Sequence, residues 1–468
     1  MDEFGIVILA AGAGTRLKMP LPKPLAPMSG RKMMDFSFGA AADFLERHKR
    51  TGKICLVLGH GKELVEAHMH EAWADKPWES AFQKQQIGTA DALRSYFNDI
   101  SDAKNRKYTV VLCADTPLIT ESEITNLVSI LESENLDAVA ATFVEEKPKG
   151  YGRIVRAKQG FHIVEEKDAS DEQRKITEVN SGLYVMKTQF ISKHLFELKS
   201  DNKSKEFYLT DLFQDDRNVK AITFSDKTPF AGVNTIAHLE DAQKQLQSRY
   251  IANARENGVR FMAADQVLID DTVALGEGVQ IYPGCVLEGH TVIGDNVILE
   301  SGVIVKDSTI ANDSKILAYS YLEKAHVGEG ASIGPFARLR EGTVVGARSK
   351  IGNFVETKKA ILQEEVKVSH LSYVGDAEIG ARTNIGCGFI TCNYDGAQKH
   401  KTIIGKDSFI GSDSQMIAPI KIGDGCYVAS GSSINQDMEP GDFAIARSKQ
   451  VTKKGMAKRF IKSPKKND

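Results

Sequence analysis

Apolar runs of strand length alternate with charged, helix-compatible segments in the first half of the chain. The runs are GIVILAA (residues 5–11), KICLVLGH (53–60) and YTVVLCAD (108–115), and stretches such as KELVEAHMHEAWA lie between them. This alternation predicts an α/β Rossmann-like domain with a mainly parallel sheet covered on both faces. Ligands of such sheets bind beyond the carboxyl ends of the strands. The glycine-rich segment after residue 11 and Asp115 both fall at such ends.

From about residue 262 the pattern changes to a repeat of an aliphatic residue, a glycine, two or three variable residues and a small or aliphatic one. The repeats start at Ile293, Val327, Ile333, Val345, Ile351, Ile379, Ile385, Ile404, Ile410 and Ile422. Four pairs of starts are six residues apart, and a hexapeptide period predicts a left-handed parallel β-helix with three hexads in each triangular coil. We expect the aliphatic residue to fill the interior and the glycine to supply permissive backbone angles at a corner.

A segment without proline separates the two patterns and is predicted to be a connecting helix. Within it, Ile236, Leu239, Leu246 and Tyr250 fall near one helical face. The predicted organisation is a nucleotide-binding domain (1–234), a linker helix (235–261) and a β-helix with a basic C-terminal tail (262–468).

Composition narrows the class of protein. The net charge of −2 favours neither nucleic acid nor a membrane surface as partner. The apolar runs are too short to span a bilayer, and the start of the chain lacks the features of a secretory signal. The six cysteines form no CxxC pair, which indicates a reducing, cytoplasmic location.

The loop LAAGAGTR (9–16) carries the first candidate chemistry. Gly12 and Gly14 permit close approach of a ligand, and exposed backbone N–H groups there can cradle phosphates. Arg16 and Lys23 follow and can neutralise a triphosphate. The longer string LAAGAGTRLKMPLPKPL resembles the signature of sugar-nucleotide pyrophosphorylases, LAAGxGTR followed by LPK.

Further segments resemble that family in its order: QQIGTADAL (85–93), CADTPLI (113–119), GYGRIV (150–155), VEEKDAS (164–170), EVNSGLYV (178–185), EFYLTDL (206–212) and GVN (232–234). The second half contains SHLSYVGDAEIG and ITCNYDG, which resemble an acetyltransferase signature. Together, the halves resemble the family of bacterial bifunctional N-acetylglucosamine-1-phosphate uridyltransferases / glucosamine-1-phosphate acetyltransferases. The resemblance implies acetyl transfer from acetyl-CoA, uridylyl transfer from UTP, Mg²⁺ as cofactor and a homotrimer.

The resemblance also implies site residues in the first half. By this resemblance, Leu9, Ala10, Ala11 and Gly12 would contact the nucleotide, and Lys23 and Arg16 would hold its phosphates. Gln83, Gly88 and Thr89 would contact the uracil side of the nucleotide. The Mg²⁺ ligands would be Asp115 and Asn234. The sugar would be held by Gly152, Glu165 and Asn180, although Glu166 could take the role of its neighbour.

In the second half, amide formation from a thioester needs a base that removes a proton from the amine, and His370 is the candidate. By resemblance, the acetyl acceptor would be bound by Arg340, Lys358, Tyr373, Asn384 and Glu356. Acetyl-CoA would be bound by Cys387, Asn393, Tyr394, Ser412, Ser430 and Arg447.

Four local features depart from the family pattern: Cys113-Ala114 in place of Tyr-Gly, LPKPLAP in place of LPKVLH, Glu341 in place of proline, and Cys387 in place of alanine. Two alternatives stay open. One is a monofunctional sugar-1-phosphate nucleotidyltransferase with a regulatory β-helix, as in ADP-glucose pyrophosphorylases. The other is a non-catalytic scaffold similar to the exchange-factor subunits of translation initiation.

Overall fold

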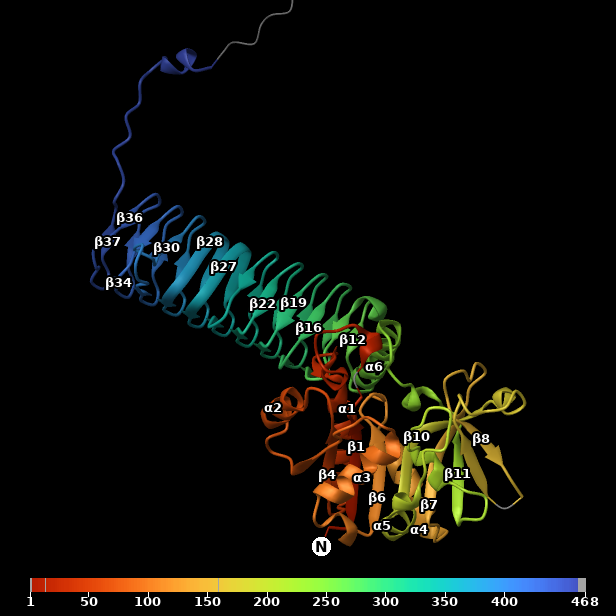
Figure 1. The fold of residues 1–468 in the computed structure, drawn as a ribbon. Coiled ribbons are helices and arrows are strands. Elements are labelled where there is room, and N and C mark those ends of the chain that lie inside the picture. Colours follow the sequence, from red (N-terminus) through yellow and green to blue (C-terminus); the bar gives the residue numbers. More distant parts are fainter. Residues whose placement is uncertain (1, 13, 159, 462–468) are drawn as a thin grey trace, which may run out of the picture. The chain divides into compact units, whose positions relative to one another are not determined.

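The computed structural model describes residues 2–12, 14–158 and 160–461 (Figure 1). It divides into two compact units, Met1–Tyr250 and Ile251–Asp468, and each is described by itself. The division falls within helix α6 (Ile236–Glu256). Within the described ranges, no helix has both the length and the apolar character needed to cross a membrane.

The first unit is built on a nine-stranded sheet with the main strand order β11-β7-β10-β6-β1-β4-β5. The strands of this path are β1 (Phe4–Ala10), β4 (Gly52–Leu58), β5 (Trp78–Phe82), β6 (Tyr108–Cys113), β7 (Ala138–Val144), β10 (Glu178–Lys187) and β11 (Val219–Phe224). Strand β10 runs antiparallel to β6 and β7, and the other pairs along the path are parallel. A hairpin of β8 (Arg153–Arg156) and β9 (Phe161–Val164) joins β10. The predicted mainly parallel sheet is confirmed.

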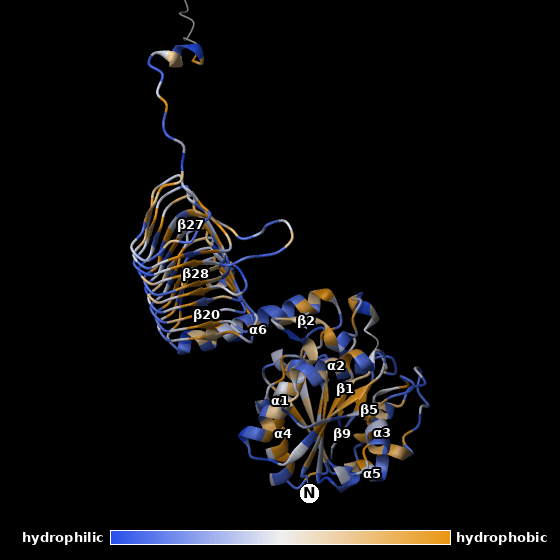
Figure 2. Cartoon of the chain, turned by 90° about the vertical axis from the view of Figure 1, so that its left-hand side faces the viewer, coloured by the Kyte–Doolittle hydropathy of each residue, from blue (hydrophilic) through white to orange (hydrophobic). Residues whose placement is uncertain are grey.

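Helices cover both faces of this sheet because alternate side chains of each strand point to opposite faces. In β1, Ile6 and Ile8 pack in the core formed with α1 (Met33–Arg47), α2 (Lys62–Ala72) and α4 (Glu121–Ser133). Val7 belongs to the opposite core, formed with α3 (Thr89–Asp99) and α5 (Thr188–His194). Figure 2 shows the resulting layers, with the strands of the sheet between α1 and α4 on one side and α3 and α5 on the other.

The first half of α6 packs on this unit. Leu239 and Leu246 are buried in a cluster with Leu118 and Val233, and Tyr250 packs against the same cluster. Ile236, the first residue of the helix, is instead 44% exposed, so the predicted apolar face begins one turn later.

The second unit is a parallel β-helix whose strands run from β12 (Arg260–Phe261) to β37 (Phe443–Ala444). Most strands pair with the strand that follows three places later in the chain. This pairing makes three-sided coils, as the hexapeptide period predicts. Two long strands, β27 (Lys350–Leu362) and β28 (Lys367–Ile379), each bend through a coil and pair along most of their length. All ten repeat-starting aliphatic residues lie in the buried core of the coils.

The repeat glycines serve a different purpose from the one expected. Of the ten that follow the aliphatic starts, only Gly334 has a positive φ. At Gly386 and Gly411, an added Cβ would lie 2.5 and 2.4 Å from the backbone nitrogen of the next coil. Glycine is therefore required because neighbouring coils approach closely, and the expectation of permissive backbone angles at these positions was wrong. The left-handed corners are occupied by residues such as Asp413 and Phe354.

Candidate active sites

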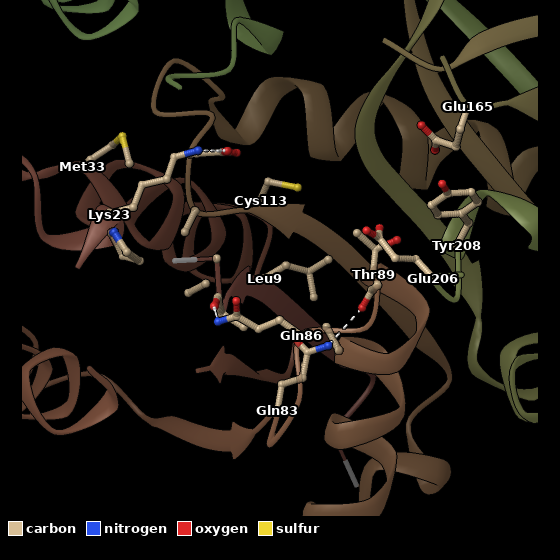
Figure 3. A pocket seen from close by; sticks show the side chains of 18 residues that line it. Leu9, Lys23, Met33, Gln83, Gln86, Thr89, Cys113, Glu165, Glu206 and Tyr208 are labelled. Carbon is tan, nitrogen blue, oxygen red and sulfur yellow. Dashed lines mark hydrogen bonds and ion pairs between the residues drawn. The ribbon is translucent and has the colours of Figure 1, made fainter. Parts of the chain in front are cut away.

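A cavity of about 400 Å³ opens at the carboxyl ends of β1 and β6 (Figure 3). These ends meet because β1 pairs in parallel with β6, which aligns Leu9 with Cys113. Ten of the predicted residues line the cavity: Leu9, Ala10, Ala11, Gly12, Lys23, Gln83, Gly88, Thr89, Asp115 and Glu165. An added Cβ at Gly12 would meet no atom within 4 Å, so its backbone is open to a ligand.

The charged end of the cavity is organised around Lys23. Its ammonium group donates hydrogen bonds to Asp115 Oδ2 and to Asn234 Oδ1, the latter at 2.8 Å. Arg16 donates from Nη2 to the same amide oxygen at 2.9 Å. The backbone N–H of Val233 donates to the carbonyl of Asp115 at 2.8 Å, which ties the segment carrying Asn234 to the end of β6. Arg16 and Asn234 thus belong to this cluster, although neither lines the cavity itself.

The oxygen atoms of Asp115 and Asn234 converge on one cation, the Lys23 ammonium. A carboxylate and an amide oxygen are hard ligands that suit Mg²⁺, which commonly takes one or two protein ligands and completes its shell with water and phosphate oxygens. The described residues contain no group of three or more His, Cys, Asp or Glu side chains that could hold a metal ion. The donor set therefore fits a magnesium ion shared with a phosphate ligand rather than a protein-enclosed metal.

The start of α3 forms another wall. Gly88 has φ +121°, and a Cβ there would lie 2.3 Å from the carbonyl oxygen of Phe207, so only glycine fits. Gln83 Nε2 donates to Gly88 O and to Asp91 Oδ2, both at 3.0 Å. Thr89 Oγ1 accepts from the N–H of Leu209 at 3.0 Å. These bonds fix the three residues predicted for the uracil side.

The residues predicted for the sugar also lie together. Asn180 donates from its backbone N–H to Gly152 O at 2.9 Å, and a Cβ on Gly152 would lie 3.6 Å from Glu165 Oε1. Glu165 lines the cavity, whereas Gly152 and Asn180 do not. Its neighbour Glu166 turns away and accepts from Arg153 Nη2 at 2.6 Å. Of the two acids, the geometry therefore favours Glu165.

Burial raises the pKa of the Glu165 carboxyl, and the nearby charges of Asp211, Asp168 and Glu206 raise it further. The hydroxyl of Thr210 partly offsets this effect by donating to Oε1 at 3.0 Å.

Sequence reasoning missed several lining residues, including Gln86, Glu206 and Tyr208. Gln86 donates its amide to the carbonyl of Ala11 and so braces the signature loop. All three lie within segments that resembled the family, QQIGTADAL and EFYLTDL. The resemblance therefore pointed to these segments but assigned no role to these three residues.

In the β-helix, one residue from each of five successive coils forms a line that we call the coil row. Its members are His370, Cys387, Ser412, Ser430 and Arg447. Backbone bonds join neighbouring positions: Gly388 N to Leu371 O, Asp413 N to Cys387 O and Gly431 N to Ser412 O. Arg447 Nη1 donates to Ser430 O at 2.7 Å. Four of the residues predicted to bind acetyl-CoA therefore extend in a line from the predicted base.

His370 is exposed, and its Nδ1 lies 3.1 Å from Asn353 Oδ1 on the preceding coil. An amide oxygen only accepts hydrogen bonds, so this contact places the ring proton on Nδ1 and leaves the Nε2 lone pair to accept a proton. Sequence reasoning missed Asn353 as the residue that orients the ring.

The predicted acceptor residues lie mostly on one face of the coils. Arg340 Nη1 donates to Glu356 Oε1 at 2.8 Å, and Glu356 is paired in register with Tyr373 on β28. Asn384, in β29 (Asn384–Ile385), aligns with Lys367 on the neighbouring face, so a single chain does not place it beside the others.

A third cation joins this face from a loop. The proximity of Lys399, and secondarily of Arg340, lowers the pKa of Lys358. Lys399 was missed because it lies in the loop 393–400, outside the repeat. That loop is held by Asp395, which accepts from the N–H groups of Ala397 and Gln398 at 2.8 and 2.7 Å.

Asn393 and Tyr394 begin the same loop and are not part of the coil row. Asn393 is buried and donates to Asp376 Oδ2 at 2.5 Å, and the exposed Tyr394 donates to Gly396 O at 2.6 Å.

Comparison with known families agrees with both halves. The family model described as nucleotidyl transferase matches residues 6–247. The GMPPB C-terminal domain model matches residues 268–353, and the bacterial transferase hexapeptide model (six repeats) matches residues 401–436.

Similar proteins extend over almost the whole chain. "Bifunctional protein GlmU" of Trichlorobacter lovleyi is 41% identical over 455 residues, 96% of this chain and 97% of that protein. The protein of the same name from Pelobacter propionicus is 38% identical over 468 residues, 99% of this chain and 100% of its own length. The crystal structure of UDP-glucose pyrophosphorylase complexed with UDP-glucose aligns with 53% of this chain and 100% of its own, at 17% identity and a TM-score of 0.42.

Relatives that match across both halves favour the bifunctional interpretation over a monofunctional nucleotidyltransferase with a regulatory β-helix. The chain combines a nucleotidyltransferase with a hexapeptide acyltransferase, and it belongs to the family of the bifunctional protein GlmU.

Proposed function

We propose that the protein makes UDP-N-acetylglucosamine in two steps. The second unit transfers acetyl from acetyl-CoA to glucosamine-1-phosphate, and the first transfers UMP from UTP to N-acetylglucosamine-1-phosphate with release of pyrophosphate. The observation that carries the proposal is the presence of two separate clusters in one chain, Lys23/Asp115/Asn234 and the coil row that starts at His370. We assign uridylyl transfer to residues 1–234, the linker to 235–261 and acetyl transfer to 262–468.

For uridylyl transfer, a phosphate oxygen of the sugar attacks the α-phosphorus of UTP and pyrophosphate leaves. Such a reaction depends on positioning and on charge neutralisation. Lys23 and Arg16 neutralise the phosphates, Gln83, Gly88 and Thr89 hold the base, and Glu165 accepts a hydrogen bond from the sugar. Asp115 and Asn234 are the proposed ligands of Mg²⁺, which supplies further positive charge to the phosphates when bound.

For acetyl transfer, the amine of the acceptor attacks the thioester carbonyl. His370 Nε2 takes a proton from that nitrogen as the tetrahedral intermediate forms. The carbon–sulfur bond then breaks, and the imidazolium returns the proton to the leaving thiolate. Arg340, Lys358 and Lys399 form a tricationic cluster that suits a dianionic sugar phosphate. Glu356 and Tyr373 border that cluster, and the coil row supports the acetyl-CoA chain.

We further propose a cytoplasmic homotrimer with small-molecule substrates and with neither nucleic acid nor membrane as partner. The trimer would bring Asn384 of one chain to the acceptor face of another, which accounts for its place on a separate face of the single chain. All six cysteines, which lie in the described part of the chain, are free thiols, in keeping with a reducing compartment.

The test is to incubate the pure protein with glucosamine-1-phosphate, acetyl-CoA, UTP and Mg²⁺ and to measure free thiol and pyrophosphate. Both should appear. Release of free thiol without pyrophosphate would disprove the proposed uridylyl transfer. Release of pyrophosphate only when N-acetylglucosamine-1-phosphate is supplied would disprove the proposed acetyl transfer.

His370→Ala should lower thiol release by about 100- to 10,000-fold, as expected for loss of a general base. It should leave pyrophosphate release from N-acetylglucosamine-1-phosphate unchanged. A parallel loss of both activities in a folded variant would contradict two independent sites.

A further inference from the structure

Three exposed aromatic rings stack along the last coils of the β-helix, and we call them the terminal stack. They are Phe409, Tyr427 and Phe443, and strand register places them one above another. Their ring centroids are 4.9 and 5.6 Å apart, with interplanar angles of 19° and 18°. An exposed stack of this kind offers a flat apolar face on which a further planar ring can stack.

The stack runs parallel to the coil row. Phe409 and Ser412 belong to one coil and Tyr427 and Ser430 to the next, each pair three residues apart across a corner. In the preceding coil, the corresponding position is Asn384, which aligns with Phe409. Any long ligand that follows the coil row therefore passes beside the rings.

Phe443 differs from the other two rings because the stack ends there. It lies in β37, and no described strand follows β37 to cover its outer face. Its exposure is accordingly 64%, against 40% for Phe409 and 47% for Tyr427. The outer face is an open stacking position for one more planar ring.

The distance from His370 to Phe443 and the charge of the chain after Phe443 indicate which planar ring could stack there. Arg447, in the coil of Phe443, lies four coil steps from His370, which is about 19 Å at the ~4.8 Å spacing of paired strands. Coenzyme A is a long chain with the thioester at one end and adenine at the other, joined through phosphates. From Phe443 to Ile461 the chain carries six Lys or Arg residues and no Asp or Glu, which suits the phosphates next to that adenine.

We propose that Phe443 is the adenine platform of acetyl-CoA, with the purine stacked on its outer face as a fourth member of the terminal stack. This inference rests on the proposed acetyl transfer and adds to it the site that holds the adenosine end. Phe443 is a binding residue here and takes no part in the chemical step.

The test compares two acetyl donors, acetyl-CoA and S-acetyl-4′-phosphopantetheine, which lacks the adenosine end. Phe443→Ala should raise the KM for acetyl-CoA about tenfold, the low end of what stacking a base on an aromatic ring contributes, with kcat little changed. It should leave the kinetics with S-acetyl-4′-phosphopantetheine as in the wild type. Phe443→Trp should keep the wild-type KM, because tryptophan retains a stacking face.

Tyr319→Ala is the matched control. Tyr319 also ends a stack of exposed rings, with its centroid 5.3 Å from that of Phe336, and it is 60% exposed. It lies on the other side of His370, three coils before Leu371, so its loss should leave both donors unaffected.

An unchanged KM for acetyl-CoA in Phe443→Ala would overturn the assignment, and so would an equal loss with both donors. Dissociation of an oligomer by this variant in size-exclusion chromatography would overturn it as well, by showing that the ring contacts a second chain. A wild-type protein inactive with both donors would overturn the proposed acetyl transfer itself, whereas wild-type KM values for both donors in Phe443→Ala would overturn only the adenine platform.

Discussion

Glu165→Gln provides a stringent test of the nucleotidyl pocket because catalysis and stability should change in opposite directions. Burial raises the pKa of this carboxyl, with further contributions from Asp211, Asp168 and Glu206. Glutamine has the same shape, and its Oε1 can still accept the hydrogen bond from Thr210 that Glu165 accepts at 3.0 Å. The substitution therefore removes the charge and little else.

The sign of the stability effect follows from linkage. A carboxyl whose pKa is higher in the folded state than in the unfolded state contributes most to stability below its unfolded pKa, about 4.3 for glutamate. That contribution is lost as the pH rises through the folded pKa, because the charged form is then held in a buried place. Glutamine has no such loss, so the variant should have the higher Tm at pH 8, and the gain should vanish near pH 4.

The catalytic effect has the opposite sign. A hydrogen bond to a charged group is worth about 1.5–3 kcal/mol, so loss of the carboxylate acceptor should lower kcat/KM for N-acetylglucosamine-1-phosphate roughly 10- to 150-fold. Pyrophosphate release with UTP measures this loss, and thiol release from acetyl-CoA by the other unit serves as the internal standard.

Asp211→Asn is the control, since burial also raises the pKa of the Asp211 carboxyl, which does not line the cavity. It should be stabilised at high pH without the loss of uridylyl transfer. A lower Tm for Glu165→Gln at pH 8, or unchanged kcat/KM in a folded variant, would refute the reasoning.

Three other outcomes are expected. Lys399→Ala should raise the KM for glucosamine-1-phosphate about tenfold, the lower end for a bond to a charged group, and leave uridylyl transfer unchanged; equal KM values would exclude Lys399 from the phosphate site. Ile333→Ala leaves a cavity at a fully buried position in the coil core and should lower the free energy of unfolding by about 2–5 kcal/mol. Urea titrations followed by circular dichroism measure this change, and a decrease below about 1 kcal/mol would contradict the packing. Cys387→Ala should remove the fastest-reacting thiol in labelling of the native protein, because Cys387 is the one exposed cysteine of the six, while acetyl transfer persists; unchanged labelling kinetics would show that another thiol is the accessible one.

Much of the fold follows from local pattern. The hexapeptide period identified the ten inward-facing aliphatic residues because each coil face has a fixed length, so inward positions recur at a fixed interval. The apolar runs at 5–11 and 108–115 likewise predicted parallel strands that carry the glycine-rich segment and Asp115 at their carboxyl ends. The structure makes these two strands neighbours, so that Leu9 and Asp115 line one cavity.

The role of the repeat glycines could not be predicted in the same way. Gly386 and Gly411 are required by the backbone of the next coil, and that constraint depends on how coils stack rather than on the turn that holds each glycine. The six-residue repeat in the sequence does not indicate how closely the backbones of neighbouring coils approach.

The sequence by itself determined two architectures, the aliphatic residues that fill the coil core and, through motif resemblance, the two chemistries. Only the tertiary structure decided which distant residues act together. Lys399 acts on Lys358 because the loop 393–400, closed by the bond from His400 N–H to Asn393 O, leaves the repeat and brings a further cation near that residue. His370 begins a row that reaches Ser430 because successive coils stack in register, and Arg447 joins it through its side-chain bond to Ser430 O. The spacing of residues along the chain sets which side chains point into the coil core. Contacts between residues of different coils depend instead on the length and path of each insertion between the coils, which only the folded structure shows.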